Sequence, residues 1–190
     1  MKGKLIAVLL CTTLYTIIRY VIFGHVSPIH VPAYLLNKSV SMASVVFLSY
    51  TAFSYSKQRV DSLRFWGTAS LHCACIHTLL SLTILSSAYY PKFFNTEKMN
   101  LTGEVTILFG VLATYCFWLA HSGKSVLVRR RIFQLLSGFL VVGHLVVMGF
   151  GGWLNVEKWH GGLPPISLVS LVFAIASLVL FSKRRAEPSC

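Results

Sequence analysis

Two histidines near the middle of long apolar stretches are the residues of this chain best suited to chemistry. His77 lies in the uncharged stretch 66–90, and His144 lies within GFLVVGHLVVMGF. A titratable side chain inside a bilayer is costly, so it requires a metal, a cofactor or another polar group as partner. Two neutral imidazoles that face each other can be the axial ligands of a b-type heme, because Nε2 binds iron well and a porphyrin can fill the gap between helices. We therefore expect both histidines to be metal ligands.

Other polar residues could contribute to cofactor binding. His72 precedes His77 by five residues, or about 140° around a helix, so the two cannot bind the same iron. We expect His72 at the level of His121, where the two could serve a second cofactor, a quinone or a proton path, or simply be satisfied by hydrogen bonds within the bundle. Arg19 is expected to snorkel to the outer interface, or else to meet an acidic group of a buried cofactor. Small residues that would let a flat macrocycle approach the helices are Gly67, Ala74, Gly138, Gly143 and Gly149.

The composition predicts that membrane-spanning helices position these residues. Hydrophobic residues make up 55% of the 190-residue chain and charged residues only 12%, whereas soluble domains contain about 25% charged residues. The apolar periodicity predicts one all-α domain over residues 1–190, a polytopic membrane six-helix bundle. The expected spans are residues 5–23, 39–55, 66–88, 101–120, 132–151 and 165–181.

The distribution of cations predicts the orientation of this bundle. With six spans, the 17 Lys and Arg residues divide into twelve on one side and five on the other. By the positive-inside rule both termini are then cytoplasmic, as in a multi-pass protein of the inner cell membrane. The outer loops carry His25, His30 and His160, to which the sequence assigns no role. Asn37-Lys38-Ser39 matches the glycosylation acceptor pattern but lies very close to a span.

Several classes of function are disfavoured by the same sequence. The net charge of +12 would suggest nucleic acid as a partner of a soluble chain, but here membrane topology accounts for it, so we expect no nucleic-acid partner. The five cysteines form no C-x-x-C pair, and a disulfide framework is not expected. The chain has no nucleophile elbow, no H-E-x-x-H and no P-loop, which argues against a hydrolase.

Short motifs of the chain resemble the ferric reductase-like transmembrane domain family. The sequence 63–67, Leu-Arg-Phe-Trp-Gly, followed by Cys75-Ile76-His77, looks like its third span, most closely in the small bacterial heme-binding subunits of the methionine sulfoxide reductase type. Residues 35–39 and 101–103 are similar to the segments that begin its second and fourth spans. The resemblance covers about 35–180. It implies a six-helix heme b protein that passes electrons across the membrane to or from a separate redox partner.

The fifth span departs from this family's pattern. The family usually has two histidines there, nearly four turns apart, and an ungapped comparison places Ser137 and Phe150 at those positions. His144 lies between them, seven residues after Ser137 and on the same helix face. The chain therefore either binds one central heme through His77 and His144 or keeps the fold without the cofactor.

The leading functional expectation is electron transfer by a membrane cytochrome b subunit, with a quinone or flavoprotein on one side and a separate redox protein on the other. A heme-free structural or assembly subunit of a membrane complex is the first alternative. A small proton-coupled transporter, with His72, His77 and His144 as a relay, is the second. Membrane-embedded carboxylates are nearly absent, which disfavours the transporter.

Overall fold

The structure is a computed structural model that describes residues 1–24, 26, 31–122 and 127–182. His25 and His30 lie outside the described residues. The described chain is almost entirely helical, as predicted, with one two-stranded hairpin. The helices are α1 (Lys2–Ile17, continued by a π-helical turn Ile18–Ile22), α2 (Val31–Ser56), α3 (Val60–Thr83), α4 (Leu101–His121), α5 (Leu127–Trp153) and α6 (Ile166–Ser182).

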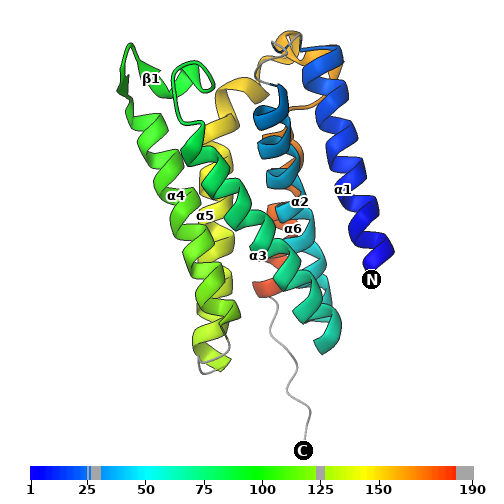
Figure 1. The fold of residues 1–190 in the computed structure, drawn as a ribbon. Helices are drawn as coiled ribbons and strands as arrows, with labels where there is room; N and C mark the ends of the chain where they lie inside the picture. Colours follow the sequence, from blue (N-terminus) through cyan, green and yellow to red (C-terminus); the bar gives the residue numbers. More distant parts are fainter. Residues whose placement is uncertain (25, 27–30, 123–126, 183–190) are drawn as a thin grey trace, which may run out of the picture.

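The six helices lie side by side as a bundle, and the start of α1 is at the same end as the end of α6 (Figure 1). Helix α2 packs against α1, α3 and α6, while α5 packs against α4 and α6. Helices α3 and α4 also touch, so α2 to α6 close a ring and α1 lies outside it against α2. The opposite end carries the hairpin of β1 (Phe94–Asn95) and β2 (Lys98–Met99), which we call the hairpin end.

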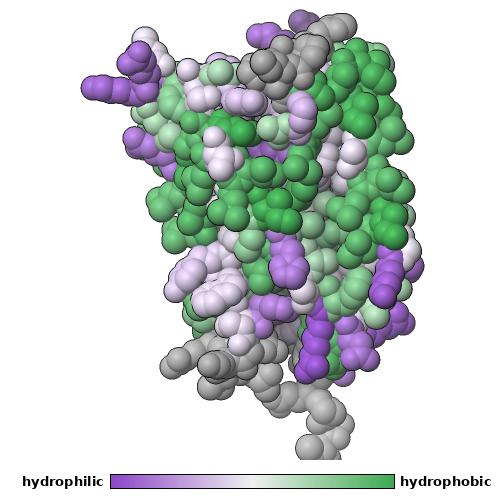
Figure 2. All heavy atoms as spheres, in the orientation of Figure 1, coloured by the Kyte–Doolittle hydropathy of each residue, from purple (hydrophilic) through white to green (hydrophobic). Residues whose placement is uncertain are grey.

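Five helices of the described chain are long and apolar enough to cross a membrane, which is the architecture of a multi-pass membrane protein. Figure 2 shows apolar residues over the middle of the visible face and hydrophilic ones mostly toward its two ends. Large apolar side chains point outward from different helices, and lipid rather than water is the medium that suits them. Examples are Leu10, Leu79, Phe139 and Val172.

Helix α3 is the one helix of the six that is not among these five. Its apolar part contains His72, His77 and several Ser and Thr residues, which lower its mean hydropathy. The predicted third span, 66–88, was also misplaced, because α3 ends at Thr83 and the chain then turns through residues rich in serine toward Pro91. Helix α2 begins at Val31, earlier than predicted, because Pro32 in its first turn is compatible with a helix start.

Hydroxyl groups connect the helices inside the ring. Ser49 Oγ on α2 donates to the Phe173 carbonyl of α6 at 2.9 Å, and Ser70 Oγ on α3 donates to the Ser44 carbonyl of α2 at 2.8 Å. Ser137 Oγ on α5 donates to the α4 carbonyl of residue 113 at 3.0 Å. Interhelical hydrogen bonds and close packing hold helices together in lipid, where no hydrophobic force acts between them. These bonds fix α2–α6, α2–α3 and α4–α5 around the centre.

The hairpin covers the start of α4. Asn100 Oδ1 accepts a hydrogen bond from the Gly103 N–H at 3.0 Å and caps the helix. A Cβ at Gly103 would lie 2.8 Å from both Met99 and Phe93, so only glycine lets the hairpin approach this closely. The segment before α4 is thereby held over the hairpin end, and it brings Tyr90 and Lys92 to the central space described next.

Candidate functional site

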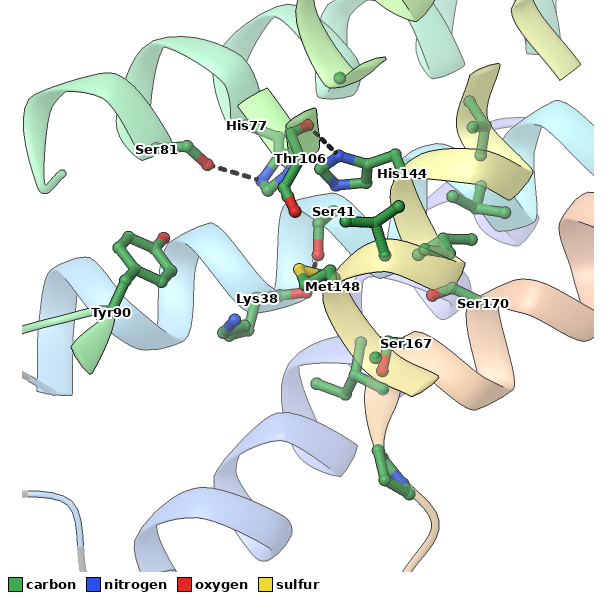
Figure 3. A pocket seen from close by; sticks show the side chains of 18 of the residues that line it. Lys38, Ser41, His77, Ser81, Tyr90, Thr106, His144, Met148, Ser167 and Ser170 are labelled. Atoms are coloured by element: carbon green, nitrogen blue, oxygen red, sulfur yellow. Dashed lines mark hydrogen bonds between the residues drawn. The ribbon is translucent and has the colours of Figure 1, made fainter. Parts of the chain in front are cut away.

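A cavity of about 1020 Å³ lies inside the ring of helices and extends toward the hairpin end. Helices α2, α3, α4, α5 and α6 all contribute to its wall. His77 and His144 both line it, together with many hydroxyl side chains (Figure 3). The hydroxyl-bearing lining residues include Ser41, Ser44, Ser70, Thr78, Ser81, Thr106, Ser137, Ser167 and Ser170.

His77 is held by a buried polar network. Its Nδ1 lies 2.6 Å from Asn37 Oδ1 and 3.4 Å from Ser81 Oγ. The Asn37 amide nitrogen in turn donates to Tyr90 Oη at 2.6 Å. An amide oxygen can only accept, so His77 Nδ1 carries the proton of the neutral ring. The network therefore leaves the lone pair of the ring on Nε2, which is the state that binds a metal.

His144 is held in the same way by backbone. Its Nδ1 lies 2.7 Å from the Thr106 carbonyl oxygen of α4, so this ring also donates through Nδ1 and keeps its lone pair on Nε2. Gly110 lies one turn further along α4, where a Cβ would be 3.1 Å from His144 Nδ1. The glycine lets the imidazole rest against the α4 backbone and reach this carbonyl.

The two rings lie next to each other across the cavity. Their centroids are 6.4 Å apart and their planes are at 80°. Two metal–nitrogen bonds of about 2 Å each place two ligating nitrogens about 4 Å apart and the ring centroids about 6 Å apart. No packed aliphatic layer separates the histidines, since both line the same cavity. Their spacing is thus compatible with two imidazoles that bind one iron.

The small residues near the histidines have other roles than predicted. A Cβ on Gly143 would meet the Phe109 ring at 2.8 Å, and one on Gly138 would meet Leu178 at 3.0 Å. Gly67 likewise lies against Thr51 and His121. These glycines permit close helix contacts. Of the five small residues predicted to admit a macrocycle, Ala74 and Gly149 line the cavity.

Arg19 lines the hairpin end of the cavity and does not snorkel. The side chain is only 4% exposed, and its guanidinium donates to the Leu163 carbonyl. It belongs to the π-helical turn of α1, and such turns are frequent at functional sites. The predicted route to the outer interface is therefore wrong, because Arg19 is buried and bonded to a backbone carbonyl.

Two lysines join Arg19 at this end. Lys38 Nζ lies over the rings of Tyr34 and Tyr90, at 5.2 and 5.4 Å from their centroids. Lys92 donates to the Met148 carbonyl of α5. Much of Lys92 is accessible, but its ammonium group is turned into the protein. Burial of that group and the nearby charge of Lys38 lower the pKa of Lys92 to about 8.

The remaining histidines lie elsewhere or at the rim. His72 is exposed and lines a separate shallow pocket with Leu5 and Arg64. His121 Nε2 lies 3.1 Å from Thr68 Oγ1, and neither His72 nor His121 lines the large cavity. His160 does line it, close to the Tyr20 ring. No group of three or more His, Cys, Asp or Glu side chains in the described ranges could hold a metal ion.

Sequence reasoning missed the residues that orient the two imidazoles. The sequence places Asn37 in a glycosylation pattern and in the motif 35–39 but assigns it no partner, yet it is 1% exposed and cannot accept a glycan as folded. Its position in an apolar helix was a usable signal, since a buried amide needs partners. Nothing in the sequence pointed to the Thr106 carbonyl or to Tyr90, because a backbone acceptor and a loop tyrosine acquire these roles only through packing.

Comparisons with known proteins leave the site to be interpreted from its geometry. No family model matches the chain, and no curated protein matches its sequence. At the two positions where the family suggested by the motifs has its fifth-span histidines, Ser137 is buried and donates to a carbonyl of α4, while Phe150 is 55% exposed.

Proposed function

We propose that this protein is a six-pass membrane protein with cytoplasmic termini that binds a b-type heme between His77 and His144 and transfers electrons. The observation that carries the proposal is the pair of imidazoles whose centroids are 6.4 Å apart in the cavity, each hydrogen-bonded through Nδ1. The size of the cavity also supports it, because about 1020 Å³ is space on the scale of a cofactor rather than of a single ion.

The six-pass topology is supported by the place of α3 in the ring. It packs against both α2 and α4, and its 24 residues make it as long as the helices that can cross a membrane. Its charged residues Asp61 and Arg64 lie in the first turns, at the end where cytoplasmic cations are expected. With α3 counted as a span, both chain ends are on the same side, and the excess of Lys and Arg puts that side in the cytoplasm.

Each residue of the site has a defined task in this proposal. His77 and His144 would hold the iron from α3 and α5, and Asn37 and the Thr106 carbonyl would fix their tautomers and ring orientations. Heme supplies one-electron redox chemistry. The donor would be a quinone or a flavoprotein and the acceptor a separate redox protein, in keeping with the ferric reductase-like resemblance of residues 35–180.

An absorbance spectrum tests the proposal directly. We expect the purified protein to show b-type bands in its reduced-minus-oxidised difference spectrum. These bands should be lost in His77→Ala and in His144→Ala, since either change removes an axial ligand. His72→Ala is the matched control, because His72 is on the same helix as His77 but exposed and outside the cavity; it should keep the bands.

The same experiment separates the alternative class of function. A folded protein without b-type bands, even after expression with added heme, would contradict the cytochrome proposal. Stable co-purification of that colourless protein with a partner would then favour a heme-free structural subunit. The specific observation in favour of this alternative is that Ser137 and Phe150 stand where the suggested family has its fifth-span ligands.

A further inference from the structure

The mouth of the cavity is lined by cations without any carboxylate. Arg19, Lys38, Lys92 and Lys158 all line it. None of the four acidic residues of the described chain does so; these are Asp61, Glu97, Glu104 and Glu157. Like charges gathered in a partly enclosed space of low dielectric repel one another and attract an anion. The mouth therefore has a positive charge that no carboxylate among its lining residues neutralises.

Arg19 adds unused donors to this charge. The guanidinium carries five N–H donors, and one of its terminal nitrogens donates to the Leu163 carbonyl. Its Nε is buried and has no hydrogen-bond partner among the described residues. A buried charge is costly unless it is paired and hydrogen-bonded. A side chain that is 4% exposed and keeps an unpartnered donor beside a cavity is arranged for a bound acceptor.

Lys38 and Lys92 face the same space from two other elements. Lys38 is held over the rings of Tyr34 and Tyr90, which orients its ammonium group at the mouth. Lys92 is anchored on the Met148 carbonyl of α5. Figure 3 shows Lys38 on the same side of the cavity as Tyr90, away from the two histidines. Its ammonium group thus leaves the space between the imidazoles free.

We propose that Arg19, Lys38 and Lys92 form a binding site for a phosphate group at the mouth of the cavity. A phosphate has several acceptor oxygens, which match an arginine fork and two lysine ammonium groups that approach from α1, α2 and the segment before α4. The phosphate belongs either to an anionic lipid headgroup or to free phosphate. The site is on the hairpin side of the histidine pair, and it does not depend on what occupies the space between the imidazoles.

Lipid retention by the full-length protein tests the site. The protein is placed in discs of phosphatidylcholine with a small fraction of phosphatidylglycerol, and the lipids that remain bound are measured by native mass spectrometry. We expect phosphatidylglycerol to be retained over phosphatidylcholine, and the preference to fall about tenfold in Lys38→Gln and Arg19→Gln, from the loss of a charged hydrogen bond. Lys98→Gln is the matched control, since Lys98 is exposed on the hairpin and outside the cavity, and it should change nothing.

Competition identifies the source of the phosphate. Inorganic phosphate at millimolar concentration should displace phosphatidylglycerol if the site takes the free ion, and should leave it bound if the site takes the lipid. Either result supports the site. Equal retention of the two lipids together with no binding of inorganic phosphate, or a preference that Lys38→Gln leaves unchanged, would overturn it. Arg19 also donates to the Leu163 carbonyl, so Arg19→Gln could fail to fold. In that case the result for Lys38→Gln decides the test. Heme is read separately by absorbance, so this proposal and the cytochrome proposal can fail independently.

Discussion

The two halves of the bundle are built on different principles. The half toward the hairpin end surrounds the cavity with hydroxyl groups, two imidazoles and cations. The other half is closed by a packed apolar cluster of Leu48, Ala52, Leu71, Phe117 and Phe181, all at most 6% exposed. We call these the hollow half and the packed half. Both contain helix-borne histidines, so a histidine in an apolar helix does not by itself define a site.

What distinguishes the histidines is the surroundings of each ring. His77 and His144 line the cavity with their Nδ1 atoms fixed by an amide and a carbonyl. His121, near the packed half, contacts Thr68 through Nε2 and lines no part of the cavity. In His121, the Nε2 atom that a metal would need is engaged by Thr68. In His77 and His144 the hydrogen bond is made through Nδ1 instead. The comparison teaches that the second partner of the imidazole decides its chemical use.

The largest expected effect is a loss of stability in the packed half. Leu71→Ala should lower the free energy of unfolding by about 2 to 5 kcal/mol, because it removes buried methyl groups and leaves a cavity that the cluster cannot fill. Denaturant titration of the purified protein in detergent measures it. Ile107→Ala is the control, since Ile107 already faces the hollow half and should cost clearly less. Equal losses would show that the two halves are packed alike.

The next effect concerns the network in the hollow half. Asn37→Leu should lower stability by about 1 to 3 kcal/mol, because His77 Nδ1 and Tyr90 Oη both lose their buried partner. Thermal unfolding monitored by circular dichroism measures it. Asn155→Leu removes only an exposed hydrogen bond to a backbone carbonyl and is expected to be nearly neutral. A neutral Asn37→Leu would mean that the network does not hold His77.

The sequence predicted the helical class and the closeness of the two mid-span histidines. It did not predict Asn37 and the Thr106 carbonyl as the groups that orient the two rings. Periodicity and length were sufficient for the helices, because a bilayer leaves few alternatives to a helix. Helix ends were predicted poorly at Val31 and Thr83, since residues of α2 beyond the apolar core remain helical and α3 ends before its apolar run does. The sequence did not predict the burial of Arg19, because the Leu163 carbonyl that it meets is brought to it only by the packing of the bundle.

A smaller effect is expected at the contact between α4 and His144. Gly110→Ala places a Cβ 3.1 Å from His144 Nδ1 and 3.2 Å from Cε1, so the ring must shift by a few tenths of an ångström. We expect a net loss of about 1 kcal/mol from this overpacking, together with a weaker bond to the Thr106 carbonyl. The histidine ring signals in NMR spectra of labelled protein should move.

Gly151→Ala is the matched control for this change, because a Cβ there meets nothing within 4 Å. Alanine is the better helix former, so the control should be neutral or slightly stabilising. If Gly110→Ala behaved like Gly151→Ala in both stability and ring signals, the close approach of His144 to α4 would be contradicted.

The smallest effect is a pH dependence at the mouth of the cavity. Burial lowers the pKa of Lys92 from 10.5 to about 8 in the folded protein, so between these two values the unfolded chain binds more protons than the folded one. Stability should therefore rise as the pH increases from about 8 toward 10.5. Much of the residue is accessible, so solvent screening keeps the rise small. Lys92→Gln should remove it, whereas Lys98→Gln, on the exposed hairpin, should leave it in place. If stability still rose with pH in Lys92→Gln, the titration would belong to another group. Lys38 and Lys92 would then not repel each other at the mouth as their positions indicate.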